Sequence, residues 1–303
     1  MTSFKEKIVL LLELFSNSIF IHIFFADGNE TWKGPFMFIQ AADTQLGLIE
    51  RYVEKKPSPK WDVEIELTRK AILKANEMSP KPKFFIVCGD LVDAFPGTKD
   101  REAQECDLKT VFKDLSNDIP LVCVCGNHDV GDTPTPESIE KYRKSYGRDF
   151  FAFYVSGVIM IVINSQYYED RTQVDMYAQE QDVWLDKILA EVKSGNYKHA
   201  IVFQHIPWFI NEPNEEKQYF NIEIELRHKM LNKFYDAGIR SIFCGHYHRN
   251  AGGLFKDMQQ VVTSAVGAQL GDDKSGLRVV KVLDTSVEHQ YFALDDVPKS
   301  VHF

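Results

Sequence analysis

Short apolar runs recur along the chain from residue 32 onward, and longer segments with helical spacing separate them. The runs "PFMFIQAAD" and "KPKFFIVCGD" predict two strands, and between them "WDVEIELTRKAILKANEMS" has the apolar spacing of an amphipathic helix. This order predicts a βαβ unit. A second helix, around "REAQECDLKTVFKDL", is expected to lead into the strand "IPLVCVC".

The second half of the chain continues the alternation. A helix near residues 135–146 is expected before "FAFYVSGVIMIVINSQ", where Ser156-Gly157 indicates a hairpin turn. The segments "AQEQDVWLDKILAEVKSG" and "RHKMLNKFYDAG" predict helices that end at a glycine, each before another strand. The closing segments "QQVVTSAV", "LRVVKVLD" and "VEHQYFALD" predict successive antiparallel strands. The predicted strands are too many for a single sheet. The pattern therefore indicates an α/β fold of two packed sheets with helices outside.

The N-terminal segment differs from the rest. Residues 8–25, "IVLLLELFSNSIFIHIFF", are largely apolar, but polar residues interrupt them and disfavour a membrane-spanning helix. A cleaved signal peptide, an amphipathic helix and a leader on a cytosolic domain remain open. We therefore expect residues 1–31 to be an apolar leader or a signal segment. Residues 32–303 are expected to form a single domain, since α/β folds of about 200–250 residues often run unsplit.

The composition limits which partners the protein can bind and which cellular compartment suits it. The net charge of −9 and the absence of a long basic block argue against a nucleic acid duplex as partner. The five cysteines have no regular spacing, which favours reduced thiols and a cytoplasmic location, or a secretory route if residues 1–25 act as a signal peptide. Cys123 and Cys125 are interpreted as buried apolar residues and not as a metal-binding pair.

Polar clusters follow five of the expected strands. In α/β sheets the ligand crevice lies beyond the carboxyl ends of the strands, so these clusters are expected to meet at one edge. They are Asp43-Thr44-Gln45, Gly89-Asp90-Leu91-Val92-Asp93, Gly126-Asn127-His128-Asp129, Gln204-His205 and Gly245-His246-Tyr247-His248.

The residue types in these clusters indicate a metal site. Asp43 and Gln45 are two positions apart, so their side chains point the same way in extended backbone. Carboxylate, imidazole and amide groups without a thiolate suit Mn, Fe, Zn or Mg, and there are enough of them for two divalent ions. Taken alone, the first two motifs are more often a turn or a loop and His205 more often a core histidine, whereas "GNHD" and "GHYH" are more specific. The five motifs together, in this order and after these strands, are not explained as turns, loops and core histidines, and they indicate a shared site.

The ordered set resembles the calcineurin-like metallophosphoesterase superfamily, whose pattern is D-x-H, GDxxD, GNH(D/E), H and GHxH. The resemblance covers about residues 34–295. Within that superfamily, several stretches are similar to those of the calcineurin-like phosphoesterase domain-containing protein 1 family. These stretches are "WKGPFMFIQAADTQLG", "KPKFFIVCGDL", "GNHDVGDTPT", "AIVFQHIPWF" and "GHYHRNAGG".

The resemblance implies a four-layer α/β/β/α sandwich with two packed mixed sheets. It also implies a dinuclear metal centre in which Asp90 bridges two ions about 3.5–4 Å apart, so that a metal-bound hydroxide attacks phosphorus. The remaining ligands implied are Asp43, Gln45 and His248 for one ion, and Asn127, His205 and His246 for the other.

The family pattern gives His128 a catalytic role. It implies that His128 faces the phosphate as general acid or transition-state stabiliser and that Asp93 orients it. Asn127, His128 and Arg249 are the residues expected to contact the substrate, although a surface-loop role for Arg249 stays open. Asp129 is expected to stabilise the loop.

Two departures limit what can be carried over. Gln45 stands where many relatives have histidine, so we expect a labile metal site and activity that depends on added Mn²⁺ or Mg²⁺. The branch that contains calcineurin has GDxVDRG, whereas Ala94 follows Asp93 here. The phosphate-clamping arginine of that branch is missing, so protein phosphatase activity cannot be inherited from it.

The named family nonetheless implies a metal-dependent serine/threonine protein phosphatase acting on phosphorylated protein or a small phosphoester, with no stable membrane span. The first alternative is a phosphodiesterase or pyrophosphatase acting on nucleotides, because Asp-x-Gln also resembles the manganese-dependent ADP-ribose pyrophosphatase group. A remote alternative is a non-catalytic binding protein with a vestigial site.

Substrate choice is expected to depend on the acidic, aromatic segment Trp208 to Glu225, which follows His205. As a pocket wall, it would use its aromatic side chains to stack on a base or cover a peptide. Its alternative is a solvated linker. The aromatic residues in question are Trp208, Phe209, Tyr219 and Phe220.

Overall fold

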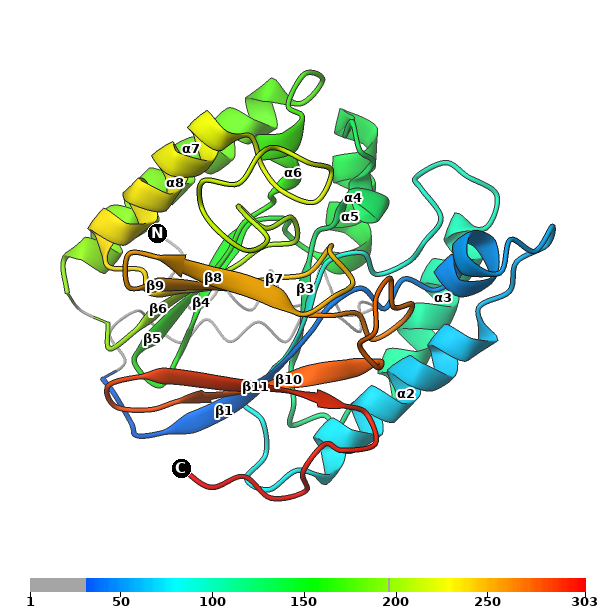
Figure 1. Cartoon of the computed structure of the whole chain (residues 1–303), viewed down its shortest axis with the longest axis horizontal. Coiled ribbons are helices and arrows are strands. Elements are labelled where there is room, and N and C mark those ends of the chain that lie inside the picture. The colour runs from blue at the N-terminus through cyan, green and yellow to red at the C-terminus, as the bar shows by residue number, and fades with distance from the viewer. Residues whose placement is uncertain (1–30, 196) are drawn as a thin grey trace, which may run out of the picture.

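Two β-sheets pack face to face in the computed structural model, which describes residues 31–195 and 197–303 (Figure 1). The first sheet has the order β11 (Val287–Ala293), β10 (Gly276–Val282), β1 (Phe36–Ala41), β2 (Phe85–Cys88), β3 (Leu121–Val124). The second has the order β4 (Phe151–Val155), β5 (Val158–Val162), β6 (Ala200–Phe203), β7 (Ser241–Cys244), β9 (Met258–Val262), β8 (Ala251–Phe255). The expectation for the leader, residues 1–30, lies outside the described residues.

Each sheet mixes parallel and antiparallel pairs. In the first sheet β1, β2 and β3 are parallel, and β10 runs antiparallel to both β1 and β11. In the second sheet β5, β6, β7 and β9 are parallel, with β4 and β8 antiparallel at the edges. The parallel strands place their carboxyl ends together, which is where ligands bind in such sheets.

Helices cover the outer face of each sheet. The helices α2 (Asp62–Glu77), α3 (Arg101–Phe112) and α5 (Pro136–Tyr146) pack on the first sheet in one apolar core. The helices α7 (Asp175–Lys193) and α8 (Ile224–Ala237) pack on the second sheet, on the opposite side of the molecule in Figure 1. Short helical turns complete the set at η1 (Ile49–Val53, a π-helix), α4 (Asn127–Val130) and α6 (Gln166–Glu169). The predicted four-layer α/β/β/α architecture is confirmed.

The strands separate two cores because their side chains alternate. Along β1, Phe36 and Phe38 point into the core between the sheets, whereas Met37 and Ile39 point into the core under α2 and α3. All six residues of β1 are buried. A strand that is covered on both faces reads as a continuous apolar run, and this is how "PFMFIQA" reads in the sequence.

The prediction for the closing strands was wrong in two respects. The segments at β9 and β10 are not neighbours, since β9 pairs with β7 and β8 in the second sheet and β10 pairs with β1 in the first. The strand β8 was not predicted. It contains Gly252 and Gly253, and glycine weakens the strand signal in a sequence because it has no side chain to pack.

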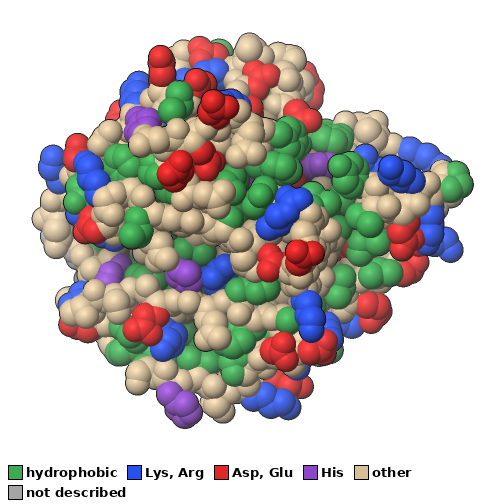
Figure 2. Space-filling model, viewed as in Figure 1, with side chains coloured by type: hydrophobic (Ala, Val, Ile, Leu, Met, Phe, Trp, Pro, Cys, Tyr) green, Lys and Arg blue, Asp and Glu red, His purple; other side chains and the backbone are tan. Residues whose placement is uncertain are grey.

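The buried thiols match their interpretation. All five cysteines are free, and Cys123 and Cys125 lie in the core under the outer helices of the first sheet. No helix in the part of the chain that the structure describes is long and apolar enough to cross a bilayer. On the face drawn in Figure 2, positive and negative side chains are interspersed.

Candidate metal centre

The five polar clusters meet at one edge of the sandwich. Asp43, Asp90 and Asn127 follow β1, β2 and β3, and His205 and His246 follow β6 and β7 of the other sheet. The seven predicted ligands, Asp43, Gln45, Asp90, Asn127, His205, His246 and His248, are all buried, with exposed fractions of 4% or less. The site therefore lies where the two sheets come together and is built by both.

Backbone conformation brings these side chains inward. Five of the seven residues have a positive φ, which few non-glycine residues adopt and which costs about 1–3 kcal/mol each. The angles are 51° for Asp43, 36° for Gln45, 50° for Asp90, 72° for His246 and 53° for His248. Local strain of this kind is concentrated at functional sites.

Two glycines allow the close approach. A Cβ atom on Gly89 would lie 2.3 Å from Nδ1 of His205, and one on Gly126 would lie 2.3 Å from Oδ1 of Asp90. Any side chain at these positions would displace a predicted ligand. The glycines that precede the polar residues are therefore part of the site.

Backbone carbonyls fix the proton position on the histidines. His205 donates from Nδ1 to the carbonyl of Cys88 (2.8 Å), and His248 donates from Nδ1 to the carbonyl of Ala268 (2.6 Å). His246 donates from Nε2 to the carbonyl of Tyr219 (3.3 Å). A carbonyl oxygen can only accept, so the lone pair of each ring is on the other nitrogen.

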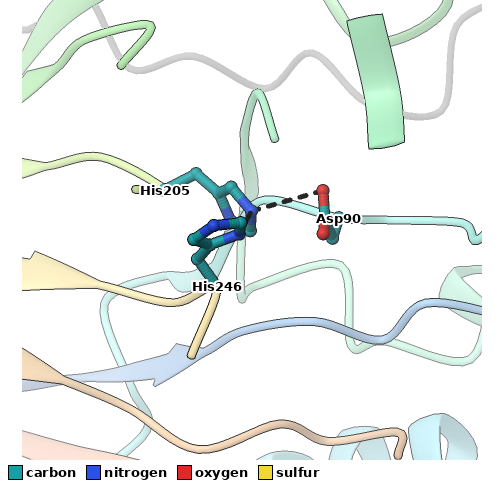
Figure 3. A group of neighbouring side chains, drawn as sticks. All are labelled: Asp90, His205 and His246. Carbon is teal, nitrogen blue, oxygen red and sulfur yellow. Dashed lines mark hydrogen bonds and ion pairs between the residues drawn. The ribbon is translucent and has the colours of Figure 1, made fainter. Parts of the chain in front are cut away.

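Those lone pairs face one another. Nε2 of His205 lies 3.1 Å from Nδ1 of His246, 3.1 Å from Oδ1 of Asn127 and 3.3 Å from Oδ1 of Asp90. Figure 3 shows the side chains of Asp90, His205 and His246 converging. Acceptors at such distances repel each other unless a proton or a cation lies between them, and the nitrogen and oxygen donors of this set fit a divalent ion.

The other half of the site has the same character. Nε2 of His248 lies 3.5 Å from Oδ1 of Asp43, and the donor atoms of Asp43, Asp90 and His248 all lie within 4.8 Å of one another. Gln45 is also buried, and its backbone N–H donates to the Asp90 carbonyl over 3.0 Å. Its Oε1 has no hydrogen-bond donor among the described residues. A buried amide oxygen without a donor is rare and fits a metal ligand.

Burial and the charges of neighbouring groups shift the pKa values of the buried carboxylates and histidines. Burial raises the pKa of Asp43 well above its usual value, whereas the charges on His205 and His128 outweigh burial and lower the pKa of Asp90. Burial opposes protonation of His205, but Asp90 and Asp43 outweigh it and raise the pKa of His205 to about 9. A proton on His205 and a divalent ion are thus alternative ways to neutralise the same carboxylates.

His128 lies beside this cluster, in contact with the Asp93 loop. Its Nδ1 donates to the backbone carbonyl of Asp93 (2.5 Å), and the Asp93 carboxylate is 3.6 Å away. The ring of Phe95 stacks on the imidazole with a centroid distance of 4.3 Å. The expected contact between His128 and Asp93 is present, and it is made mainly through the backbone.

The carboxylate of Asp93 is instead paired with Arg51, which the sequence analysis missed. Both Nε and Nη2 of Arg51 donate to Asp93, the latter over 2.6 Å. Asp93 is 1% exposed and the Arg51 side chain 46% exposed. Arg51 lies in η1, a π-helical turn with no recognisable sequence pattern, and it belongs to no motif.

Asp129 holds the loop in place, as expected. Its Oδ1 accepts from the backbone of Leu91 (3.1 Å) and its Oδ2 from the backbone of Gly126 (2.8 Å). Burial, followed by the charge of Asp90, raises the pKa of Asp129 to about 7. Arg101 of α3 donates to the carbonyls of His128 and Asp129, and these hydrogen bonds hold the backbone of the turn in place.

The aromatic residues in the segment after His205 lie in two different places, the apolar core and the candidate site. Trp208 and Phe209 are fully buried in the core under α8, so the expectation that they form a pocket wall was wrong. Burial of their apolar rings in the core, and not their closeness to His205 in the sequence, decides where these two side chains lie. Tyr219 and Phe220 do reach the site, with ring centroids 5.1 and 5.5 Å from that of His246.

The structure places Arg249 at the side of the site. Its guanidinium lies over the ring of Tyr247 at 4.8 Å and donates to the Tyr247 carbonyl over 3.3 Å. It is half-buried. Its expected contact with the substrate stays a prediction.

Sequence comparison identifies relatives along most of the chain. A family model described as calcineurin-like phosphoesterase matches residues 38–250. A serine/threonine-protein phosphatase CPPED1 from Bos taurus is 44% identical over 277 residues, covering 90% of this chain and 88% of the relative. The proteins of that name from Homo sapiens and Danio rerio are 45% and 43% identical, over 90% and 89% of this chain and 88% and 89% of theirs.

Solved structures share the fold at low sequence identity. Purple acid phosphatase PPD1 from yellow lupin superposes with a TM-score of 0.61 at 11% identity, covering 89% of this chain and 53% of its own. A dimetal phosphatase from Danio rerio superposes with a TM-score of 0.55 at 15% identity, covering 86% of this chain and 99% of its own. The family model and the sequence relatives agree with this fold, and the chain belongs to the calcineurin-like phosphoesterase family of hydrolases.

Proposed function

We propose that the protein is a dinuclear metal-dependent phosphatase that hydrolyses phosphomonoesters, with phosphoserine and phosphothreonine side chains of proteins as substrates. The observation that carries the proposal is the convergence of ring nitrogens and side-chain oxygens of His205, His246, Asn127 and Asp90. The similarity to the serine/threonine-protein phosphatases CPPED1 supports the choice of protein substrates.

The proposed ligands follow from which donor atoms face each other. Asp90 belongs to both groups of neighbouring donors and is the proposed bridge. The ligands assigned to one ion are Asn127, His205 and His246, and those assigned to the other are Asp43, Gln45 and His248. When bound, divalent ions in such a pair polarise a phosphoryl group and lower the pKa of water.

The chain itself supplies proton transfer. The proton on Nδ1 of His128 is held by the carbonyl of Asp93, so Nε2 is the atom left to face the substrate. As water attacks phosphorus and the bond from phosphorus to the serine or threonine oxygen breaks, the protonated ring of His128 transfers its Nε2 proton to that departing oxygen. Asp93 and Arg51 hold this ring in place, and Phe95 limits its rotation.

A nucleotide-directed phosphodiesterase or pyrophosphatase is the second candidate. It is favoured by Gln45 in the first motif and by the exposed ring of Tyr219 (59% exposed) beside His246, which offers a stacking surface for a base. The two candidates differ in the charge and size of the group next to phosphorus.

A turnover panel on purified full-length protein reconstituted with Mn²⁺ or Mg²⁺ tests the proposal. It compares phosphoserine and phosphothreonine peptides with ADP-ribose, a cyclic nucleotide and bis-p-nitrophenyl phosphate, and uses Asp90→Asn as the blank. Higher kcat/KM on the phosphopeptides supports a protein phosphatase. Higher values on ADP-ribose or the diester favour the second candidate, and no turnover with any metal favours a vestigial site.

We further propose that residues 32–303 form one domain and that the protein acts in the cytoplasm. Its five free thiols, of which Cys88, Cys123, Cys125 and Cys244 are buried, support a reducing compartment. Fluorescence of a C-terminal fusion spread through the cytosol is expected. Fluorescence in the secretory pathway would contradict the location, and failure of residues 32–303 to fold alone would contradict the domain.

A further inference from the structure

The loop between β6 and α8 has a fixed backbone although much of it is exposed. Arg227 of α8 is fully buried and donates to the carbonyls of Pro213, Glu215 and Ile222 over 2.6–3.1 Å. The Glu215 carboxylate in turn accepts from the backbone of Ile210 (2.6 Å) and Asn211 (2.8 Å). These bonds use the groups that a solvated linker would leave to water, so the segment is a structured loop.

This loop carries Tyr219 to the metal centre, where it contacts two predicted ligands at once. Its hydroxyl oxygen accepts from Nδ2 of Asn127 over 3.2 Å, and its backbone carbonyl accepts from Nε2 of His246 over 3.3 Å. Its ring also packs against the imidazole of His246, with centroids 5.1 Å apart.

The contact with Asn127 bears on which way its amide faces. Nδ2 donates to the Tyr219 hydroxyl and to Oδ1 of Asp132 (2.8 Å), so both amide hydrogens are used. Oδ1 is then left facing Nε2 of His205. A flipped amide would set its oxygen against the Asp132 carboxylate and turn its NH₂ group toward the site, where it cannot bind a cation.

The contact with His246 decides which ring nitrogen is free. Because the Tyr219 carbonyl accepts from Nε2–H, the lone pair is on Nδ1, the atom that lies 3.1 Å from Nε2 of His205. Partners of this kind set the tautomer and orientation of metal ligands, and their loss typically lowers metal affinity about 10–100-fold.

We propose that Tyr219 is a positioning residue that orients Asn127 and His246, two ligands of the same ion, and so links the β6–α8 loop to the affinity of that one metal site. The inference rests on the proposed function for the existence of the dinuclear centre. The inference goes beyond the proposed function by assigning the β6–α8 loop to one of the two ions.

The test is Mn²⁺ binding to the full-length, metal-stripped protein, measured by titration calorimetry and by electron paramagnetic resonance. Tyr219→Phe keeps the ring and the carbonyl but removes the hydroxyl acceptor. We expect the affinity of one Mn²⁺ ion to fall about tenfold and that of the other to stay unchanged. Tyr235→Phe, on α8 and distant from the predicted ligands, is the matched control and is expected to bind as the wild type does.

A second background separates positioning from a structural role. If Tyr219 acts through Asn127, Tyr219→Phe has no further effect on Mn²⁺ affinity in an Asn127→Ala protein. Unchanged Mn²⁺ affinity in the single variant, or an equal loss in both backgrounds, would overturn the inference. A raised KM at unchanged Mn²⁺ affinity would likewise overturn it, by making Tyr219 a substrate contact. A wild-type protein that binds no Mn²⁺ would instead show that the proposed centre itself is wrong.

Discussion

Asp90 is the side chain on which both halves of the proposed centre depend. Its carboxylate belongs to both donor groups, and its Oδ1 also accepts from the backbone of His128 over 2.9 Å. The charge on His205 and His128 keeps its pKa low in spite of burial, so it is an anion at neutral pH. No neutral side chain of similar size can replace that charge.

We therefore expect Asp90→Asn to lower kcat/KM at least about a hundredfold, more than is typical for losing a residue that only orients a ligand. The measurement is hydrolysis of p-nitrophenyl phosphate with added Mn²⁺. Asp114→Asn, at an exposed carboxylate, is the control and should retain wild-type turnover. Turnover of Asp90→Asn within threefold of the wild type would argue against the bridging role.

Arg51 is the second residue whose loss is informative. Without it the buried carboxylate of Asp93 loses the guanidinium that donates two hydrogen bonds to it, and weakening the pairing of a buried charge is costly. We expect Arg51→Ala to lower kcat about tenfold or more, because Asp93 and the imidazole that it holds lose their position. Arg51→Lys should restore kcat only in part, since an ammonium keeps the charge without the two-point geometry.

Steady-state kinetics on a phosphopeptide check this expectation. Arg69→Ala removes an exposed arginine of α2 and should change neither kcat nor KM. A rise in KM at constant kcat in Arg51→Ala would mean that Arg51 binds the substrate and does not position His128.

At the scale of elements, the strand pair β10–β11 contains a buried cation, Arg278, that is hydrogen-bonded to neutral groups. Arg278 of β10 is 6% exposed, and it donates to Thr263, to Asn250 and to Nδ1 of His289, the last over 2.9 Å. Burial, followed by the charge of Arg278, lowers the pKa of His289 to about 4. His289 is therefore a neutral acceptor in the folded protein.

This arrangement predicts a loss of stability in acid. The unfolded chain binds a proton at His289 with a pKa near 6.5, so it gains protons before the folded state does. The contribution of His289 to the free energy of unfolding should be constant above about pH 6.5 and fall by about 1–2 kcal/mol as the pH drops toward 4, after allowance for partial solvent exposure.

Denaturant unfolding of metal-stripped protein at several pH values measures this effect. His289→Gln keeps a neutral acceptor that does not titrate, so its stability should fall less than that of the wild type over the same range. Parallel curves for the two proteins would assign the acid sensitivity to other groups.

Helices were predictable from the sequence where the spacing of apolar residues and the capping residues indicate the same bounds. The helix α5 begins after Thr135, whose side chain accepts from Ser138, and α8 ends at Gly238 in a left-handed conformation. The π-helical η1 has no such signals. It is held from outside, because the buried carboxylate of Glu64 on α2 accepts from the backbone of Gly47 and Ile49. A contact across 15 residues leaves no local pattern to detect.

The candidate site was predictable to a similar extent. Residues directly after strands, such as Asp43 and His246, could be placed from the chain alone because parallel strands share an edge. Arg51 and Asp132 could not, because tertiary contacts set the course of the segments that carry them. Tyr219 was expected at the pocket wall, but its contacts with Asn127 and His246 leave no pattern in the sequence.

At the scale of the whole molecule, a group of phenylalanines joins the two sheets. Phe38 of β1 is fully buried, stacks on Phe84 at 4.5 Å and meets the edges of Phe203 and Phe243 of the second sheet. Since ligands come from both sheets, this core also sets the distance between the two halves of the site.

We expect Phe38→Ala to lower the free energy of unfolding by about 3–5 kcal/mol, through lost burial and the cavity left behind. Urea unfolding followed by tryptophan fluorescence measures it. Phe303→Ala, at a ring that is 50% exposed near the C-terminus, should change stability by less than about 0.5 kcal/mol. A Phe38→Ala protein as stable as this control would mean that the inter-sheet core tolerates the loss.

The protons on the site histidines are placed by main-chain oxygens, at Cys88, Asp93, Tyr219 and Ala268. Every residue type has a carbonyl, so mutation at these four positions can change the side chain without removing the acceptor. The protonation pattern of the site is thus inherited with the path of the backbone, and it can persist through evolution when the side chains at these positions change.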